Sequence, residues 1–215
     1  MEDIKNIAVL VSGGGTNLQA LINAEKDGRL KSGRVTLVLS SNPEAYALSR
    51  AKENKIETCI VDRKLFSDRT EYSRALLKEL NSRKIDLIIL AGFMYILDSN
   101  FIKHYKNAII NIHPALIPSF CGDGFYGVRV HEAALDYGVK LTGATAHFVN
   151  EVTDGGPIIL QKAVEVKEGD TPEILQRRVM EQAEWEILPL AAELFCAGRL
   201  SIEDRTVRIS KNNQT

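Results

Sequence analysis

The segment NIAVLVSGGGTNLQALI, residues 6–22, decides the fold. An apolar run from Ile7 to Val11 leads into Ser12-Gly13-Gly14-Gly15-Thr16-Asn17, and apolar residues then recur at helical spacing. This order predicts a strand, a glycine turn and a helix. The alternation continues, with strands predicted over 35–39, 58–61, 85–91 and up to Asn111, and helices over 44–54, 67–81 and 98–104. It indicates an α/β fold: an open, mostly parallel twisted sheet with helices on both faces.

The second half of the chain departs from this alternation. A helix is predicted over 128–137, and two β-prone runs, 141–149 and 157–166, are expected to add an antiparallel hairpin to the sheet. Thr171-Pro172 then opens one long helix that runs to about Ala197, with Pro189 as a candidate kink. The remainder predicts one final strand before a polar tail over 210–215. We expect residues 1–215 to form a single domain.

Composition and charge favour a cytoplasmic protein that acts on small molecules. The formal net charge is -1 and the pI is near 6.4, so neither nucleic acid nor an anionic membrane is an expected partner. No stretch is long and apolar enough to span a membrane, and no cleavable signal is evident before the first strand. Cys59, Cys121 and Cys196 are odd in number and far apart, which predicts free thiols rather than disulfides or a metal site.

The glycine turn is a candidate phosphate site. Glycines let several peptide N–H groups approach an anion, and the following helix adds its positive amino-terminal end near Gly15, Thr16 and Asn17. A dinucleotide site is disfavoured, because Leu18 stands where its third glycine would fall and no acidic residue ends the second strand. The absence of a Gly-Lys-Ser/Thr motif excludes a phosphate-loop NTPase. A phosphomonoester site and a purely structural turn remain as alternatives.

A second candidate site lies where the run Ala108-Ile109-Ile110 ends in NIHPALIP, residues 111–118. Asn111 and His113 are two residues apart and point to the same side of an extended segment. Their amide and imidazole groups suit an oxyanion donor and a proton-transfer group. In the alternative interpretation, Asn111 caps a turn and His113 is a structural histidine.

Asp154, in the hairpin loop before Gly155-Gly156, is the third candidate. A carboxylate in contact with His113 is expected to raise the pKa of the imidazole and make it a general acid near neutral pH. An amide donor, such an acid and an orienting carboxylate together suit acyl-type transfer through a tetrahedral intermediate. The alternative is that Asp154 is a solvated turn residue.

Four segments occur in an order that resembles one family: VLVSGGGTNLQALI, DLIILAGFMYIL, NIHPALIPSF and GATAHFVNEVTDGGPIILQ. Over roughly residues 5–200 the chain resembles the phosphoribosylglycinamide formyltransferases of purine biosynthesis, members of the 10-formyltetrahydrofolate formyltransferase superfamily. The resemblance implies a Rossmann-like formyltransferase fold, with a phosphate-binding half over about 1–105 and a folate-binding and catalytic half over about 106–200. It also implies the substrates 5-phosphoribosylglycinamide and 10-formyltetrahydrofolate, no metal, and a monomer or homodimer.

The resemblance further implies roles for individual residues. The catalytic group is expected to comprise Asn111, His113 and Asp154. The residues expected to bind the ribonucleotide are Gly15, Thr16, Asn17, Leu18, Gln19 and Glu184. Those expected to bind the folate are Arg69, Met94, Tyr95, Ile96, Leu97, Asn111, Val152 and Thr153. His147 matches a histidine near the catalytic group, although it fits a strand alternation equally well.

In the reaction that the resemblance implies, the ribonucleotide amine attacks the formyl carbon, and Asn111 and protonated His113 stabilise the oxyanion. His113 then helps to protonate the departing folate nitrogen. Some relatives carry arginine in place of Tyr95, and the loop 120–127 is longer than in some of them, as either a mobile flap or a surface excursion. The competing functions are those of a methionyl-tRNA formyltransferase, a formyltetrahydrofolate hydrolase and a non-enzymatic phospholigand-binding module.

Overall fold

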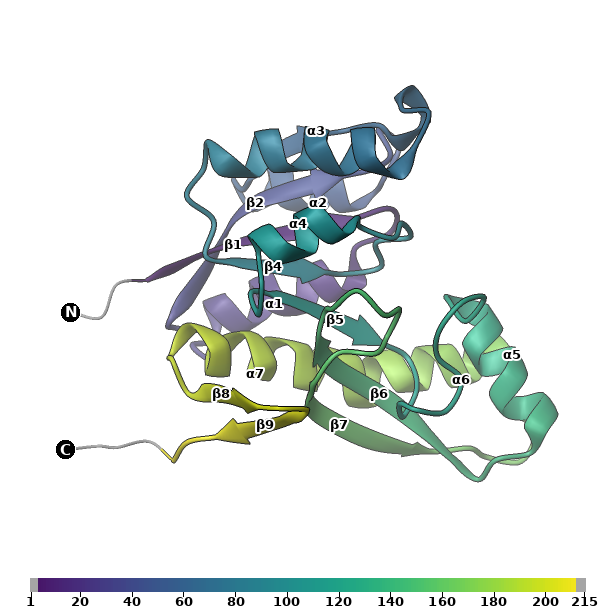
Figure 1. Cartoon of the computed structure of the whole chain (residues 1–215). Helices are drawn as coiled ribbons and strands as arrows, with labels where there is room; N and C mark the ends of the chain where they lie inside the picture. The colour runs from purple at the N-terminus through teal and green to yellow at the C-terminus, as the bar shows by residue number, and fades with distance from the viewer. Residues whose placement is uncertain (1–3, 212–215) are drawn as a thin grey trace. The chain divides into compact units, whose positions relative to one another are not determined.

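The computed structural model describes residues 4–211, and the chain divides into two compact units after Ile110 (Figure 1). Of the polar tail predicted over 210–215, residues 212–215 lie outside the described residues. The elements of the first unit are β1 (Lys5–Val11), α1 (Thr16–Lys26), β2 (Gly33–Ser40), α2 (Ala47–Glu53), β3 (Glu57–Ile60), η1 (Arg63–Leu65), α3 (Arg69–Asn81), β4 (Leu87–Leu90) and α4 (Ser99–His104).

The strands of the first unit lie in the order β3-β2-β1-β4, and each neighbouring pair is parallel. Ile7 to Val11 in β1 and Leu87 to Leu90 in β4 are buried, as expected for strands covered on both faces. Helix α1 packs with α2 and α3 packs with α4, and the two pairs cover opposite faces (Figure 1). The strand order therefore reverses between β1 and β4, which is where an open α/β sheet places its ligand crevice.

The second unit begins within β5 (Ile109–His113), whose last three residues belong to it. Its strands follow the order β5-β6-β7-β9-β8; β6 pairs antiparallel with β7, β9 pairs parallel with β7, and β8 pairs antiparallel with β9. The helices η2 and α7 pack against both β6 and β7, and α6 packs against β6. The remaining bounds are α5 (Val128–Tyr137), β6 (Leu141–Phe148), β7 (Ile158–Glu165), α6 (Pro172–Val179), η2 (Met180–Glu184), α7 (Trp185–Cys196), β8 (Leu200–Glu203) and β9 (Thr206–Ile209).

These pairings confirm the predicted α/β fold with a mostly parallel sheet and an added antiparallel hairpin. Two details of the prediction are wrong. The predicted long helix is interrupted by the π-helical turn η2, while Pro189 lies inside α7. A proline ring clashes with the carbonyl four residues earlier, here Trp185, and the irregular turn ends immediately before that residue. The predicted final strand is two strands, because Asp204 adopts a left-handed φ of 54° and the chain turns back.

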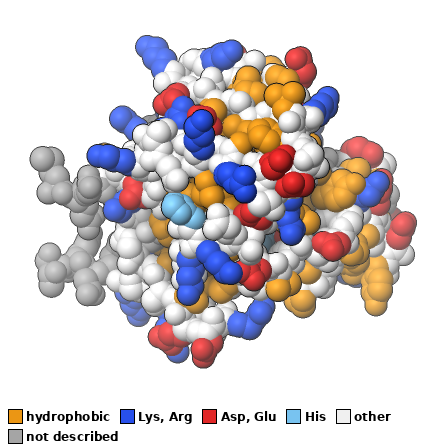
Figure 2. Space-filling model, turned by 45° about the horizontal axis from the view of Figure 1, so that its top comes forward, with side chains coloured by type: hydrophobic (Ala, Val, Ile, Leu, Met, Phe, Trp, Pro, Cys, Tyr) orange, Lys and Arg blue, Asp and Glu red, His pale blue; other side chains and the backbone are white. Residues whose placement is uncertain are grey.

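The helices, the charged surface and the cysteines can be compared with what the composition predicted. None of the helices in residues 4–211 is long and apolar enough to cross a membrane. On the face seen in Figure 2, Lys and Arg side chains are mixed with Asp and Glu side chains. The predicted free thiols are confirmed for Cys59, Cys121 and Cys196.

Candidate active site

The glycine turn of the first unit is shaped by the close approach of α2. Gly15 precedes α1 with a left-handed φ of 72°, and a methyl group added there would lie 2.6 Å from the Cβ of Ala47. Glycine is therefore required at this position. The amino terminus of α1 has no side-chain cap, so its positive end faces the turn. Leu18 is fully buried, which leaves only its peptide group to face a ligand.

Arg50 of α2 adds a positive charge beside the glycine turn. Its Nε donates to the carbonyl oxygen of Gly14 at 2.9 Å, and its Nη1 donates to Oε1 of Gln19 at 3.1 Å. The guanidinium also lies over the ring of Tyr46, 5.0 Å from its centre. The sequence prediction missed Arg50, because no local motif indicates that α2 packs against the turn.

The loops that follow β1 and β4 meet in the first unit. The peptide N–H of Met94 donates to the Oγ of Ser12 at 3.0 Å. Of the predicted folate segment, Met94, Tyr95 and Ile96 are exposed, whereas Leu97 is buried. Arg69 is exposed at the start of α3. An apolar surface therefore lies next to the glycine turn at the switch point of the strand order.

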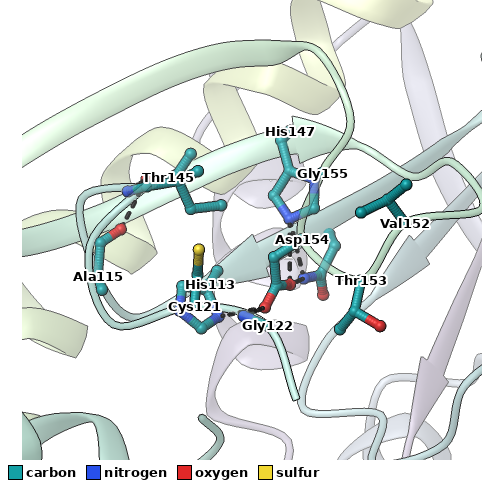
Figure 3. A network of polar contacts seen from close by, with 12 residues as sticks. His113, Ala115, Cys121, Gly122, Thr145, His147, Val152, Thr153, Asp154 and Gly155 are labelled. Atoms are coloured by element: carbon teal, nitrogen blue, oxygen red, sulfur yellow. Dashed lines mark hydrogen bonds and ion pairs between the residues drawn. The ribbon is translucent and has the colours of Figure 1, made fainter.

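Asp154 lies between two histidines in the second unit (Figure 3). Its Oδ2 is 3.5 Å from Nδ1 of His113, and its Oδ1 is 3.6 Å from Nε2 of His147. Nδ2 of Asn111 is 3.1 Å from Nε2 of His147 and 3.5 Å from Oδ1 of Asp154. Both histidines are buried. The predicted trio thus forms one network, and His147 is part of it.

The acceptors around the two imidazoles define which nitrogens carry hydrogen. Nε2 of His113 lies 2.8 Å from the carbonyl oxygen of Phe120, and Nδ1 of His147 lies 2.8 Å from that of Phe148. A carbonyl oxygen only accepts, so each of these nitrogens donates. In neutral His147, Nε2 then accepts from the Asn111 amide. In neutral His113, Nδ1 is the unprotonated nitrogen and faces Asp154.

Burial lowers the pKa of His113 below its ordinary value, although Asp154 and the Phe120 carbonyl act in the opposite direction. The sequence left contact between His113 and Asp154 open, and the structure brings the two side chains within 3.5 Å. Asp154 raises the pKa of His113 as expected, but burial outweighs this effect, so the expectation that His113 is a general acid near neutral pH is wrong. Burial raises the pKa of Asp154, yet interactions with His147 and His113 and the Gly122 N–H outweigh it, and the net pKa is below its ordinary value. The resting site therefore pairs a carboxylate with an imidazole that gives up its proton readily.

The Asp154-Gly155-Gly156 sequence fixes the carboxylate through its backbone. Asp154 itself has a left-handed φ of 52°, which is uncommon for a non-glycine residue. A methyl group on Gly156 would lie 1.7 Å from the carbonyl oxygen of Phe148, and one on Gly155 would lie 2.6 Å from Val152. The glycines therefore allow the loop to fold tightly onto β6 and turn Asp154 inward. The predicted alternative of a solvated turn residue is wrong, since the Asp154 side chain is only 10% exposed.

The loop 120–127 also takes part in the network. The N–H of Gly122 donates to Oδ2 of Asp154 at 2.9 Å, and the hydroxyl of Thr153 donates to Asp123 at 3.2 Å. Phe120, whose carbonyl contacts His113, has a left-handed φ of 48°. The loop thus holds both the imidazole and the carboxylate. Sequence reasoning missed the contacts of Phe120 and Gly122 because these residues make them through backbone atoms.

Thr145 supports the proline-rich segment that follows His113. Its hydroxyl donates to the carbonyl of Ala115 at 2.6 Å and accepts from the N–H of Ile117 at 3.1 Å. Gln161, its partner across β6 and β7, donates to the same hydroxyl at 3.0 Å. The alternation of Thr145 and His147 along β6 was the only sequence signal for this support. Among residues 4–211, no three His, Cys, Asp or Glu side chains gather as a metal site requires.

The remaining predicted residues lie elsewhere in the second unit. Val152 and Thr153 are exposed in the loop before Asp154. Glu184 is the last residue of the π-helical turn η2 and is buried. A π-helical turn is an uncommon element that often occurs at functional sites.

Comparisons with known proteins agree on one family. The model of the formyl transferase family matches residues 5–192. The chain is 40% identical to the phosphoribosylglycinamide formyltransferase of Haemophilus influenzae, over 94% of this chain and 92% of that protein. The crystal structure of glycinamide ribonucleotide transformylase 1 from Symbiobacterium toebii is similar, with a TM-score of 0.90, 42% identity and coverage of 97% and 95% of the two chains. The trifunctional purine biosynthetic protein adenosine-3 of Gallus gallus is 42% identical over 91% of this chain, which spans only 19% of that protein.

Proposed function

Because the chain belongs to the formyl transferase family, we propose that it transfers the formyl group of 10-formyltetrahydrofolate to the amine of 5-phosphoribosylglycinamide. The products are formylglycinamide ribonucleotide and tetrahydrofolate, and the reaction belongs to purine biosynthesis. The observation that carries the proposal is the buried network of Asn111, His113, His147 and Asp154. It occurs in a chain that matches a phosphoribosylglycinamide formyltransferase over nearly its whole length.

The glycine turn is the proposed site for the phosphate of the ribonucleotide. The uncapped start of α1, with Gly15, Thr16 and Asn17, would face the phosphate. Arg50 lies beside the turn and adds positive charge, while Gln19 is held by Arg50. Glu184 is proposed to accept from the ribose hydroxyls, as the sequence resemblance implies.

The exposed loop after β4 is the proposed folate surface of the first unit. Met94, Tyr95 and Ile96 offer apolar contact to an aromatic substrate, and buried Leu97 anchors the segment. Arg69 is proposed to contact the folate from the start of α3. In the second unit, the same role is proposed for Asn111, Val152 and Thr153.

His113 is proposed to move a proton during the transfer. The amine attacks the formyl carbon, and the positively charged nitrogen of the tetrahedral intermediate loses a proton to Nδ1 of His113. The imidazolium is stabilised by Asp154 at Nδ1 and by the Phe120 carbonyl at Nε2. It returns the proton to the folate nitrogen as the carbon–nitrogen bond breaks. The lowered pKa of His113 suits the first step, because the imidazole is neutral before the amine attacks.

Asn111 is proposed to stabilise the oxyanion by hydrogen bonding, with His147 fixing the orientation of its amide. His147 is therefore a positioning residue in this proposal. We also propose that the protein acts in the cytoplasm, as a monomer or homodimer, on small molecules alone.

The proposal is tested by following tetrahydrofolate formation from 10-formyltetrahydrofolate by absorbance, with and without 5-phosphoribosylglycinamide. We expect formation to depend on the ribonucleotide and to yield equal amounts of its formyl derivative. Formation that is independent of the ribonucleotide would instead indicate a hydrolase. Binding of the ribonucleotide without any formyl transfer would indicate a binding module.

A further inference from the structure

Arg63 of η1 is held among aromatic rings beside the exposed loop that follows β4. Its guanidinium carbon lies 5.5 Å from the centre of the Tyr72 ring and 5.7 Å from that of Tyr95. Its Nη1 donates to the carbonyl oxygen of Phe66 at 2.7 Å. These contacts fix the position of a charge that would otherwise sit on a flexible side chain.

The rings form a platform that reaches from the core to the surface. Tyr72 is buried, and its ring centre lies 5.5 Å from that of Phe66, 6.3 Å from that of Phe93 and 5.9 Å from that of Tyr95. Tyr95 is 38% exposed, and it is flanked by the exposed side chains of Met94 and Ile96. The outer edge of the platform is therefore apolar and open to a ligand.

The carboxylates closest to Arg63 along the chain make hydrogen bonds to other groups. Asp62 accepts from the N–H of Lys64, Asp68 accepts from the first turn of α3, and Glu71 accepts from Ser67. Within residues 4–211, no ion pair joins Arg63 to an acidic side chain. The guanidinium thus keeps donors for an anion that lies over the platform.

An aromatic molecule with a carboxylate fits this combination. The proposed formyl donor carries a benzoyl ring linked to glutamate, whereas the ribonucleotide acceptor has no aromatic ring. Guanidinium groups recognise carboxylates through paired hydrogen bonds. Some relatives carry arginine at the position of Tyr95, so this chain has no cation there. The guanidinium of Arg63 lies over the ring of Tyr95 instead.

We propose that Arg63 binds a carboxylate of the glutamyl group of the formyl donor, with the donor's benzoyl ring packed against Tyr95. This inference rests on the proposed function, because it takes 10-formyltetrahydrofolate as the donor. It adds to the proposed folate site a residue that the sequence did not predict.

Two donors separate charge recognition from packing: 10-formyltetrahydrofolate and 10-formyltetrahydropteroate, which lacks the glutamyl group. For Arg63→Met we expect the KM of the glutamylated donor to rise roughly tenfold to a hundredfold, as for loss of a charged hydrogen bond. The KM of the pteroate and the KM of the ribonucleotide should change less than about twofold. Arg63→Lys should retain part of the effect, because it keeps the charge but not the paired donors. Lys64→Met removes a neighbouring exposed cation and should leave the KM values of both donors unchanged.

An equal rise in KM for both donors would overturn the proposal and limit Arg63 to packing on the rings. Unchanged kinetics in a folded Arg63→Met protein, checked by its thermal unfolding, would also overturn it. Calorimetric binding of the same two compounds to the same variants does not require turnover. If the wild-type chain binds the glutamylated compound through Arg63 but transfers no formyl group, the proposed function fails while the role of Arg63 stands.

Discussion

Nδ1 of His113 lies 3.5 Å from Oδ2 of Asp154, at the buried end of β5. The N–H of Gly122 approaches the same oxygen, and Nε2 of His113 is occupied by the carbonyl of Phe120. An acceptor faces each nitrogen of the imidazole, and this arrangement stabilises the imidazolium, while burial destabilises it. Because these two effects oppose one another, the imidazole of His113 can accept a proton and then release it.

Loss of either partner is expected to abolish most of the turnover. His113→Ala removes the proton carrier, and Asp154→Asn removes the charge that stabilises the imidazolium. We expect each change to lower kcat by about a hundredfold or more, in the range found for general acid–base groups. Steady-state formyl transfer measures this, with thermal unfolding to check that the variants fold.

His104→Ala serves as the matched control, because His104 is an exposed histidine outside the network. Its turnover should equal that of the wild-type protein. Turnover within a few-fold of wild type in His113→Ala or Asp154→Asn would remove these residues from the reaction.

The pKa of His113 offers a direct test of the electrostatics. Burial holds it below the ordinary value, and the carboxylate of Asp154 raises it part of the way back. In Asp154→Asn the pKa of His113 should therefore fall further. An NMR titration of the imidazole resonances, with single histidine variants to assign the 4 histidines, measures both values. A higher pKa in Asp154→Asn than in wild type would contradict the arrangement.

Sequence patterns predicted the elements that depend on local periodicity. The apolar run of β1, the glycine turn and the alternating strands and helices were all visible, because burial on both faces of a parallel sheet leaves a continuous apolar signature. Asn111 and His113 were predicted from their spacing on one strand. That Asp154 meets His113 could be proposed from the residue types, and it needed the structure to establish the distance.

The interactions that sequence did not predict are those made by backbone atoms or by packing. The Phe120 carbonyl and the Gly122 N–H could belong to any residue, so no side-chain pattern marks them. The fall in the pKa of His113 depends on how deeply the imidazole is buried, which residue identity does not specify. Arg50 and Arg63 act through packing against the glycine turn and the aromatic rings.

The buried His131 leads us to predict that the free energy of unfolding depends on pH. It is fully buried in α5, and neither ring nitrogen has a hydrogen-bond partner among residues 4–211. Burial lowers its pKa from 6.5 to about 4. Between these values the unfolded chain binds a proton that the folded chain does not, so stability falls as the pH is lowered through this window. The full loss attributable to His131 is about 3 kcal/mol.

Urea unfolding at pH 7.5 and at pH 4.5 checks this for wild type and His131→Leu. The variant should lose less stability between the two pH values than wild type does. His104→Leu, which changes an exposed histidine, should lose as much as wild type. An equal loss in wild type and His131→Leu would show that the group responsible lies elsewhere.

Thr145 connects the stability of the second unit to the position of His113. Thr145→Val deprives the N–H of Ile117 of its acceptor and the carbonyl of Ala115 of its donor. The amide of Gln161 loses one acceptor and keeps the carbonyl of Ile117. We expect a loss of about 1–3 kcal/mol in the free energy of unfolding, the usual cost of leaving a buried polar group without a partner. Because the segment from Ala115 leads to the Phe120 carbonyl at His113, kcat should fall as well.

Thr142→Val is the matched control on the same strand, since the buried Thr142 hydroxyl has no partner among residues 4–211 and its removal should be neutral or stabilising. If both valine variants unfold at the same urea concentration and turn over equally, the hydrogen bonds of Thr145 do not support the active site.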